Sequence, residues 1–233
     1  DERPSIVSEA TVDPVLKSHE LITSPAHIVI KDADEFHDKT TVPNQLWQMD
    51  FTYLKLVGWG WYDLSTLPDD FSRTIVAWKL CPTMQASDVT ATLDLALGAA
   101  ELDQARVMPR PRLLSDNGPS YVASDLADWL GIRGMTHIRG APCHAQTQGK
   151  IERWLQMLKN RILLEHAYLP GELERLVADF VEHYNNARAH ESLSNLTPAD
   201  VYFGRGEGIL AERERIKRQT LMDRRLRHHA QAA

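Results

Sequence analysis

The sequence predicts an α/β domain built on a mixed sheet, with further helices after it. Three segments rich in aromatic and β-branched residues come first and are separated by turn sequences, as is typical of an antiparallel meander. Strand-like and helix-like segments then alternate, which places more strands and their covering helices in the same domain. The three leading strands are predicted over residues 46–57, 59–67 and 74–80.

The first predicted helix begins at Ser87, a good N-cap residue, and extends to about Gln104 because its apolar residues fit one broad face. Pro68 directly follows the second strand and cannot donate to a sheet ladder, so we expect that strand to end early. The remaining predictions are strands over 112–115 and 135–139, helices over 124–130 and 171–188, a helix from about 148, a helix start at 197–200 and a charged helix near the end.

The composition is that of a globular protein. The chain has 233 residues, of which 43% are hydrophobic and 25% charged, and this length is sufficient to bury a core. No segment approaches the roughly 20 apolar residues of a membrane span, and residues 1–4 lack the pattern of a secretory signal. Two cysteines, Cys81 and Cys143, exclude a disulfide framework and a four-cysteine zinc site. We therefore expect a cytoplasmic protein.

The net charge of −6 is distributed unevenly along the chain. Residues 1–46 and residues 162–204 each carry a net charge of −5. Residues 139–161 and residues 205–233 each carry a net charge of +4, so two basic segments belong to an acidic chain. Taken alone, such basic segments are more often solvated helix faces than a nucleic-acid surface, and the overall charge does not decide the partner.

Three acidic residues occupy positions where a carboxylate can take part in catalysis. In the first strand, alternation puts Asp50 on the face opposite Trp47 and Met49, where it either faces solvent or needs a compensating cation. Asp116 follows a strand within a sequence that also favours a turn. Glu152 lies in the first turn of a helix, where a glutamate commonly compensates the helix dipole. Taken singly, each residue has a structural explanation.

Together, the three acids predict a metal site. Ligand sites in open α/β sheets lie beyond the carboxyl ends of strands, where acids from two strands and a following helix can converge. Carboxylates are the ligands that Mg²⁺ and Mn²⁺ prefer. Without a cation, three converging negative charges repel, and at least one carboxyl has to take up a proton. Two such ions about 3.5–4 Å apart activate an attacking oxygen and stabilise the leaving one in phosphoryl transfer.

The motifs around these acids resemble those of the retroviral-integrase-like (Asp-Asp-Glu) transposases of bacterial insertion sequences. Between Asp116 and Glu152 lie 35 residues, the characteristic gap of that family, and the resemblance covers residues 43–203. The motifs are residues 48–53 (Gln-Met-Asp-Phe-Thr-Tyr), 114–118 (Leu-Ser-Asp-Asn-Gly), 144–153 (His-Ala-Gln-Thr-Gln-Gly-Lys-Ile-Glu-Arg), 69–73 (Asp-Asp-Phe-Ser-Arg), 184–185 (Tyr-Asn) and 196–199 (Leu-Thr-Pro-Ala).

The resemblance implies a ribonuclease-H-like, mixed five-stranded sheet flanked by helices, with a C-terminal helical extension. It implies two divalent ions, Mg²⁺ or Mn²⁺, held by Asp50, Asp116 and Glu152. The implied reaction is nicking of DNA at the ends of the element, followed by attack of the freed 3′-hydroxyl on target DNA. A homo-oligomer as the active form and a bacterial, nucleoid-associated location belong to the same expectation.

The expected organisation has three parts. Residues 1–42 are an N-terminal tail or the remnant of an upstream DNA-binding region, residues 43–203 are the catalytic core, and residues 204–233 are a basic, helical tail. The basic residues around Glu152 are expected to contact phosphates, which positions a duplex without reading its sequence. The residues predicted to contact DNA are His144, Gln146, Lys150, Arg153 and Lys159.

The other candidate residues receive structural interpretations. His137, Cys143 and His144 lack a fourth partner at the usual spacing for zinc. Asp69 and Asp70 are interpreted as the turn between the second and third strands, rather than as metal ligands. The tryptophans are expected to serve core packing rather than base stacking; they are Trp47, Trp59, Trp61, Trp78, Trp129 and Trp154.

Two departures from the family pattern keep a second function open. The family usually has proline after the histidine of its third motif, where this chain has Ala145, and an aliphatic residue before the acidic pair, where this chain has Pro68. These departures and the acidic balance favour a catalytically silent DNA-binding or regulatory derivative of a transposase, whereas the retained acids favour an enzyme. A nuclease of the same fold without the joining step is a third possibility.

Overall fold

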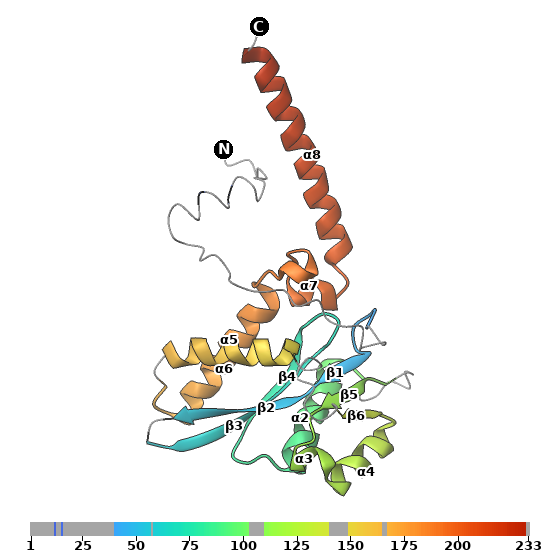
Figure 1. Cartoon of the computed structure of the whole chain (residues 1–233), viewed down its shortest axis with the longest axis vertical. Coiled ribbons are helices and arrows are strands. Elements are labelled where there is room, and N and C mark those ends of the chain that lie inside the picture. Colours follow the sequence, from blue (N-terminus) through green and yellow to red (C-terminus); the bar gives the residue numbers. More distant parts are fainter. Residues whose placement is uncertain are drawn as a thin grey trace. The chain divides into compact units, whose positions relative to one another are not determined.

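The computed structural model describes residues 12, 15, 40–56, 58–102, 110–139, 149–164 and 167–231 of the chain. Residues 34–203 include one compact unit that holds all strands and helices from β1 to α7 (Figure 1). Helix α8 (Gly206–Gln231) belongs to a second unit and is considered by itself.

The sheet is mixed, as the sequence predicts. β2 (Asp50–Leu56), β3 (Gly60–Pro68) and β4 (Ile75–Cys81) form the antiparallel meander. β1 (Leu46–Gln48) pairs in parallel with β5 (Arg112–Ser115), which pairs in parallel with β6 (His137–Arg139). Only Met49 separates β1 from β2, so the two halves join through one nearly continuous strand. Counting β1 and β2 as one, the architecture is the expected five-stranded α/β fold.

Helices cover both sides of this sheet, and most begin near the predicted positions. They are α2 (Ala86–Ala99), α3 (Pro119–Val122), α4 (Ser124–Arg133), α5 (Gly149–Leu164), α6 (Pro170–Asn186), the short 3-10 helix η2 (Glu191–Leu193) and α7 (Pro198–Tyr202). The predicted cap of α2 is wrong, because Gln85 is the N-cap and its N–H donates to Asp88 Oδ2 over 3.2 Å. The one-turn helix α3 was not expected, since Gly118-Pro119 favours a break; Pro119 instead opens a new helix.

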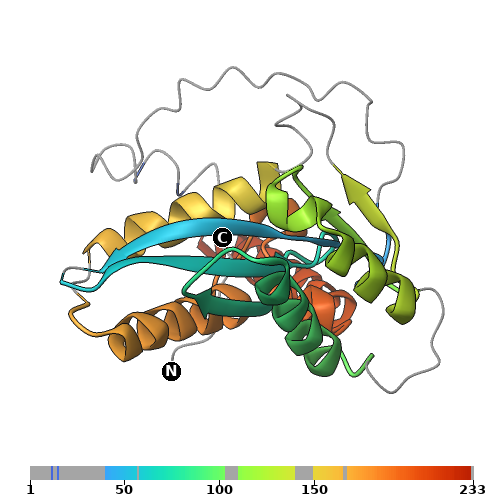
Figure 2. The same ribbon diagram turned by 90° about the horizontal axis from the view of Figure 1, so that it is seen from below.

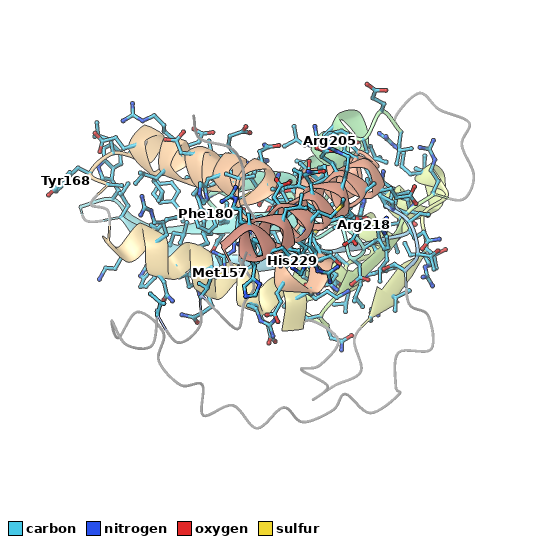
Figure 3. All side chains as sticks on the ribbon, turned by 90° about the horizontal axis from the view of Figure 1, so that it is seen from above. Met157, Tyr168, Phe180, Arg205, Arg218 and His229 are labelled. Carbon is cyan, nitrogen blue, oxygen red and sulfur yellow. The ribbon has the colours of Figure 1, made fainter. Side chains whose placement is uncertain are left out.

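Two hydrophobic clusters fix the helices on the sheet. The predicted alternation in the first strand is confirmed: Trp47, Met49 and Phe51 pack in the cluster formed with α2 and α4, whereas Leu54 and Leu56 pack in the cluster formed with α5 and α6. Figures 1 and 2 show α5 and α6 on a different side of the strands from α2, α3 and α4. Phe180 of α6 and Met157 of α5, both labelled in Figure 3, belong to the margin of the second cluster.

Two expectations about individual residues are wrong. Pro68 does not shorten its strand: β3 runs through Pro68, and a register shift between Leu67 and Pro68 accommodates the missing N–H donor. Trp59 and Trp61 do not pack in the core, since they are 57% and 63% exposed around the β2–β3 turn. The ammonium of Lys55 lies 5.6 Å from the centroid of the Trp61 ring.

Helix α8 is polar on most of its surface. Ion pairs between successive turns support it, from Arg215 to Glu212 over 2.7 Å and from Arg218 to Glu214 over 3.0 Å. Arg218 and His229 mark this helix in Figure 3. Among the described residues, no helix combines the length and the apolar character that crossing a membrane requires.

We predict that Asn185 joins α6 to the edge strand β4 and that Asn185→Ala lowers the free energy of unfolding by about 1–3 kcal/mol. The Asn185 side chain accepts from the N–H of Ile75 over 2.9 Å and donates to the Ile75 carbonyl over 3.0 Å, and both backbone groups lose their partner in the variant. Urea denaturation measures the loss. The matched control is Asn186→Ala, since Asn186 is exposed and bonds only to a carbonyl of its own helix, Glu182 O; equal losses in the two variants would contradict the prediction.

Candidate active site

The register between β1 and β5 brings two of the predicted acids together. Gln48 pairs with Leu114, and the N–H of Met49 donates to Leu114 O over 2.8 Å. Continuing this parallel register by two residues places Asp50, at the start of β2, beside Asp116, which directly follows β5. Both acids therefore lie where the paired segments leave the parallel half of the sheet, at the carboxyl end of β5.

The pKa of Asp50 depends on the other two acids. Burial is the main reason that its pKa is raised from 3.8 to about 6, and the carboxylates of Asp116 and Glu152 raise it further. The N–H of Phe51 donates to Asp50 Oδ1 over 2.8 Å, and this bond and the ammonium of Lys159 lower the pKa. Two further acids and one lysine, which come from the segment after β5 and from α5, thus act on the carboxyl group of Asp50.

Asp116 is exposed and serves the turn as well as the site. Its Oδ1 accepts from the N–H of Gly118 over 2.9 Å, and a Cβ at Gly118 would lie only 3.0 Å from that oxygen. The other Asp116 oxygen keeps free lone pairs, so the turn explanation and the site explanation are compatible. Tyr121 lies behind the two aspartates; burial and their charges raise the pKa of its hydroxyl well above 10.

Glu152 lies in the first turn of α5, and its side chain is exposed. The buried stripe of this helix fixes which face turns to the sheet, because Ile151, Trp154 and Leu158 are at most 1% exposed. Lys159 follows Glu152 by about two helical turns, which places its ammonium along the same side of α5. Glu152 and Lys159 therefore lie on a polar face beside the apolar stripe of α5.

The three acids approach one another without closing on a common point. Among the described residues, no three Asp, Glu, His or Cys side chains lie close enough together to hold a metal ion. The donor set nevertheless suits a hard divalent cation: it consists of carboxylate oxygens, and Asp50 is held at a raised pKa by burial and by two further negative charges. The exposed side chain of Glu152 has rotamers available for a move toward the aspartates.

The other predicted site residues fall into three groups. Lys150 pairs with Asp70, with 2.7 Å between Nζ and Oδ1. Arg153 is exposed, and no ion pair engages it within the part of the chain that the structure describes. His144 and Gln146, predicted to contact DNA, lie outside the described residues, as do Cys143 and Ala145.

Asp69 and Asp70 have a larger role than the predicted turn. They open the β3–β4 turn as expected, but they are only 1% and 9% exposed. Asp69 Oδ2 accepts from the Ser72 N–H over 2.8 Å and from the Ser72 hydroxyl over 2.7 Å, while burial raises its pKa. Two adjacent acids directly after an apolar strand were the available signal, because buried carboxylates need partners of their own.

We predict that Asp50→Asn stabilises the metal-free protein at pH 8 by up to about 3 kcal/mol. Folding raises the pKa of Asp50 from 3.8 to about 6. The stability that the protonated Asp50 contributes to the fold is therefore fully present below pH 3.8 and is lost as the pH rises through about 6. An amide that cannot ionise avoids this loss and can still accept from Phe51. Urea denaturation with EDTA at pH 8 and near pH 4 measures the effect, which should vanish at the lower pH. Asp128→Asn, at an exposed acid of α4, is the control; an unchanged or lower stability of Asp50→Asn at pH 8 would refute the prediction.

Comparison with known proteins identifies the domain. Two matches to the integrase core domain cover residues 40–145 and residues 133–198. Transposase InsF of the insertion sequence IS3A from Escherichia coli strain K12 is 28% identical over 162 residues, which are 67% of this chain and 53% of InsF. The chain spans about half the length of the curated relatives it matches.

Solved structures show the same fold. The catalytic core domain of HTLV-2 integrase, in complex with magnesium (dimeric form), superimposes with a TM-score of 0.55 at 18% identity, over 70% of this chain and 99% of that one. A chain of the simian T-cell lymphotropic virus intasome, in complex with PP2A regulatory subunit B56 gamma, gives a TM-score of 0.60 at 21% identity, over 71% of this chain and 56% of that one. The ribonuclease-H-like fold is therefore confirmed. The chain belongs to the integrase core domain family and is homologous to the InsF transposases of IS3 insertion sequences.

Proposed function

We propose that this chain is the catalytic part of a DNA transposase that nicks the ends of its element and joins the freed 3′-hydroxyl to target DNA. One observation carries the proposal: the Asp50 carboxyl is buried beside two further acids, at a raised pKa, in a domain homologous to transposases. This arrangement does not stabilise the fold, because each added negative charge destabilises the ionised form of Asp50. A role in binding a cation would account for it.

Asp50, Asp116 and Glu152 would hold the divalent metal, Mg²⁺ or Mn²⁺, in a two-ion site. When bound, such ions lower the pKa of an attacking hydroxyl and stabilise charge on the leaving oxygen. The residues of the chain supply three things: oxygen ligands, the Gly118 N–H that fixes the Asp116 carboxylate, and the half-buried strand β2 that holds Asp50. The related HTLV-2 core was solved with magnesium, and the donor chemistry here is compatible with the same ion.

The positive side chains around the acids favour DNA as the substrate. Lys159 lies near enough to Asp50 to lower its pKa, and this proximity supports a role for its ammonium in binding a phosphate beside the acids. Arg153, one residue after Glu152, is exposed on the same helix. We propose that Arg153, Lys159, His144 and Gln146 contact the DNA backbone and that Lys150 contributes positive charge beside them.

We extend the proposal to the organisation of the protein. Residues 43–203 form the catalytic core, residues 204–233 form a basic helical tail, and residues 1–42 are a tail or a remnant of a DNA-binding region. The active form is a homo-oligomer on DNA ends in the bacterial nucleoid. The homology to transposases and the likeness to an intasome chain support this assembly.

We predict that Asp50→Asn, Asp116→Asn and Glu152→Gln each reduce nicking and joining at least about 100-fold, since a metal supplies several kcal/mol of transition-state stabilisation. Product formation on a labelled terminal oligonucleotide, compared with circular dichroism of each variant, measures the loss in a folded protein. Glu174→Gln is the control, because Glu174 is an exposed acid of α6 outside the site. Wild-type turnover in any of the three variants would remove that residue from the mechanism.

We predict that the same assay gives joined products with Mn²⁺ and none with EDTA, because the carboxylates carry no reaction without a cation. Nicks without joined products would identify a nuclease of this fold. No products with any metal would identify the catalytically silent, DNA-binding derivative, for which the open arrangement of the three acids is the structural argument.

A further inference from the structure

We propose that Asp70 is a positioning residue that sets the placement of Glu152 relative to Asp50, by holding β1 and α5 on one carboxylate. This inference rests on the proposed function, since it concerns the geometry of the proposed metal ligands. It adds a buried acid that is not itself a ligand, and it gives Lys150 a task other than contact with DNA.

The contacts of Asp70 join the two elements that carry the acids. Asp70 Oδ1 accepts from Gln48 Nε2 over 2.7 Å and from Lys150 Nζ over 2.7 Å, and Lys150 Nζ also donates to the Asp70 carbonyl over 3.0 Å. Asp70 Oδ2 accepts from the Thr40 hydroxyl over 2.7 Å. Gln48 lies two residues before Asp50, and Lys150 lies two residues before Glu152. One carboxylate therefore links both acid-bearing segments immediately before their acids.

Asp70 is itself held firmly in place. Its N–H donates to Leu46 O over 2.9 Å, which ties it to β1. The turn around it is fixed by Asp69, whose Oδ1 accepts from the Asn44 N–H over 2.7 Å and whose Oδ2 binds Ser72. The turn also holds Arg73 at a positive φ of 66°, a conformation that persists only where the surroundings impose it. Asp70 is thus a rigid reference point rather than a mobile surface acid.

Because of helix geometry, the contact between Lys150 and Asp70 also restrains the direction of Glu152. Successive residues of an α-helix are rotated by about 100°, so holding Lys150 fixes the direction of Glu152 two residues later. Lys150 lies in the first turn of α5, where few backbone hydrogen bonds restrain the chain. The Lys150 side chain is 42% exposed, and ion pairs of this kind add little to stability. Its effect is therefore expected on the site rather than on the overall fold.

The test measures Mn²⁺ affinity of the full chain by electron paramagnetic resonance of the free ion. We expect Lys150→Met to weaken Mn²⁺ binding about 10–100-fold, the range found when residues that orient metal ligands are lost. Lys150→Arg keeps a donor for Asp70 and should restore most of the affinity. Asp70→Asn keeps neutral partners for Gln48 and Thr40 but loses the ion pair, so it should weaken binding even if Lys150→Met folds poorly.

A matched ion pair elsewhere provides the control. Lys79 and Asp88 lie 3.6 Å apart with side-chain exposures of 36% and 11%, against 42% and 11% for Lys150 and Asp70. Lys79→Met should leave Mn²⁺ affinity unchanged. In a Glu152→Gln background, Lys150→Met should have no further effect, because a residue that acts through Glu152 has nothing left to position.

Other roles of Lys150 give different results. If Lys150 acted only through its charge, Lys150→Met would tighten Mn²⁺ binding, because a cation would be removed from beside the site; if it only contacted DNA, Mn²⁺ affinity would not change. Either result overturns the positioning role and leaves the proposed function intact. A wild-type chain that binds no Mn²⁺ would overturn the proposed metal chemistry and the positioning role with it.

Discussion

The parallel register between β1 and β5 is the constraint on which the site depends. It aligns Gln48 with Leu114 and so carries Asp50 and Asp116 to the same edge of the sheet. A slip of one residue would move Asp50 to the opposite face of the strand, among the apolar residues packed against α2. The buried Trp47 and Met49 oppose such a slip, because it would move both of them out of the hydrophobic cluster formed with α2 and α4. Core packing thus fixes the relative position of two acids whose charges repel.

The repulsion between these acids links the stability of the fold to its proposed activity. Burial and the two neighbouring carboxylates hold the Asp50 pKa near 6, so the metal-free protein gives up stability at neutral pH. In the proposed metal site, a bound divalent cation would relieve this cost by compensating the charges. The nearby lysines do not compensate these charges in full: Lys150 is engaged by Asp70, and Lys159 lowers the pKa of Asp50 but leaves it raised. On the proposed function, activity and stability are therefore opposed at this site, and the buried clusters on both sides of the sheet stabilise the fold against the repulsion of the acids.

Local patterns in the sequence were sufficient for most of the fold. Alternation around Asp50, the apolar stripe of α5 and the Thr197 cap of α7 all depend on neighbouring residues, and the structure has them. The partners of Asp70 were not predictable in this way, since Thr40 and Lys150 are 30 and 80 residues away from it. The strand through Pro68 and the exposure of Trp61 also depend on long-range pairing and on where the covering helices end. The three acids were found by spacing and resemblance, and their roles as ligands stay a prediction.

The most direct test of the central claim is a crystal structure of the chain grown or soaked with Mn²⁺, with the anomalous signal used to locate the ion. The account predicts anomalous density contacted by carboxylate oxygens of Asp50 and Asp116, with the Glu152 side chain turned toward them. Density elsewhere, or none at a saturating Mn²⁺ concentration, would contradict it, as would an occupied site that the Glu152 carboxylate does not contact.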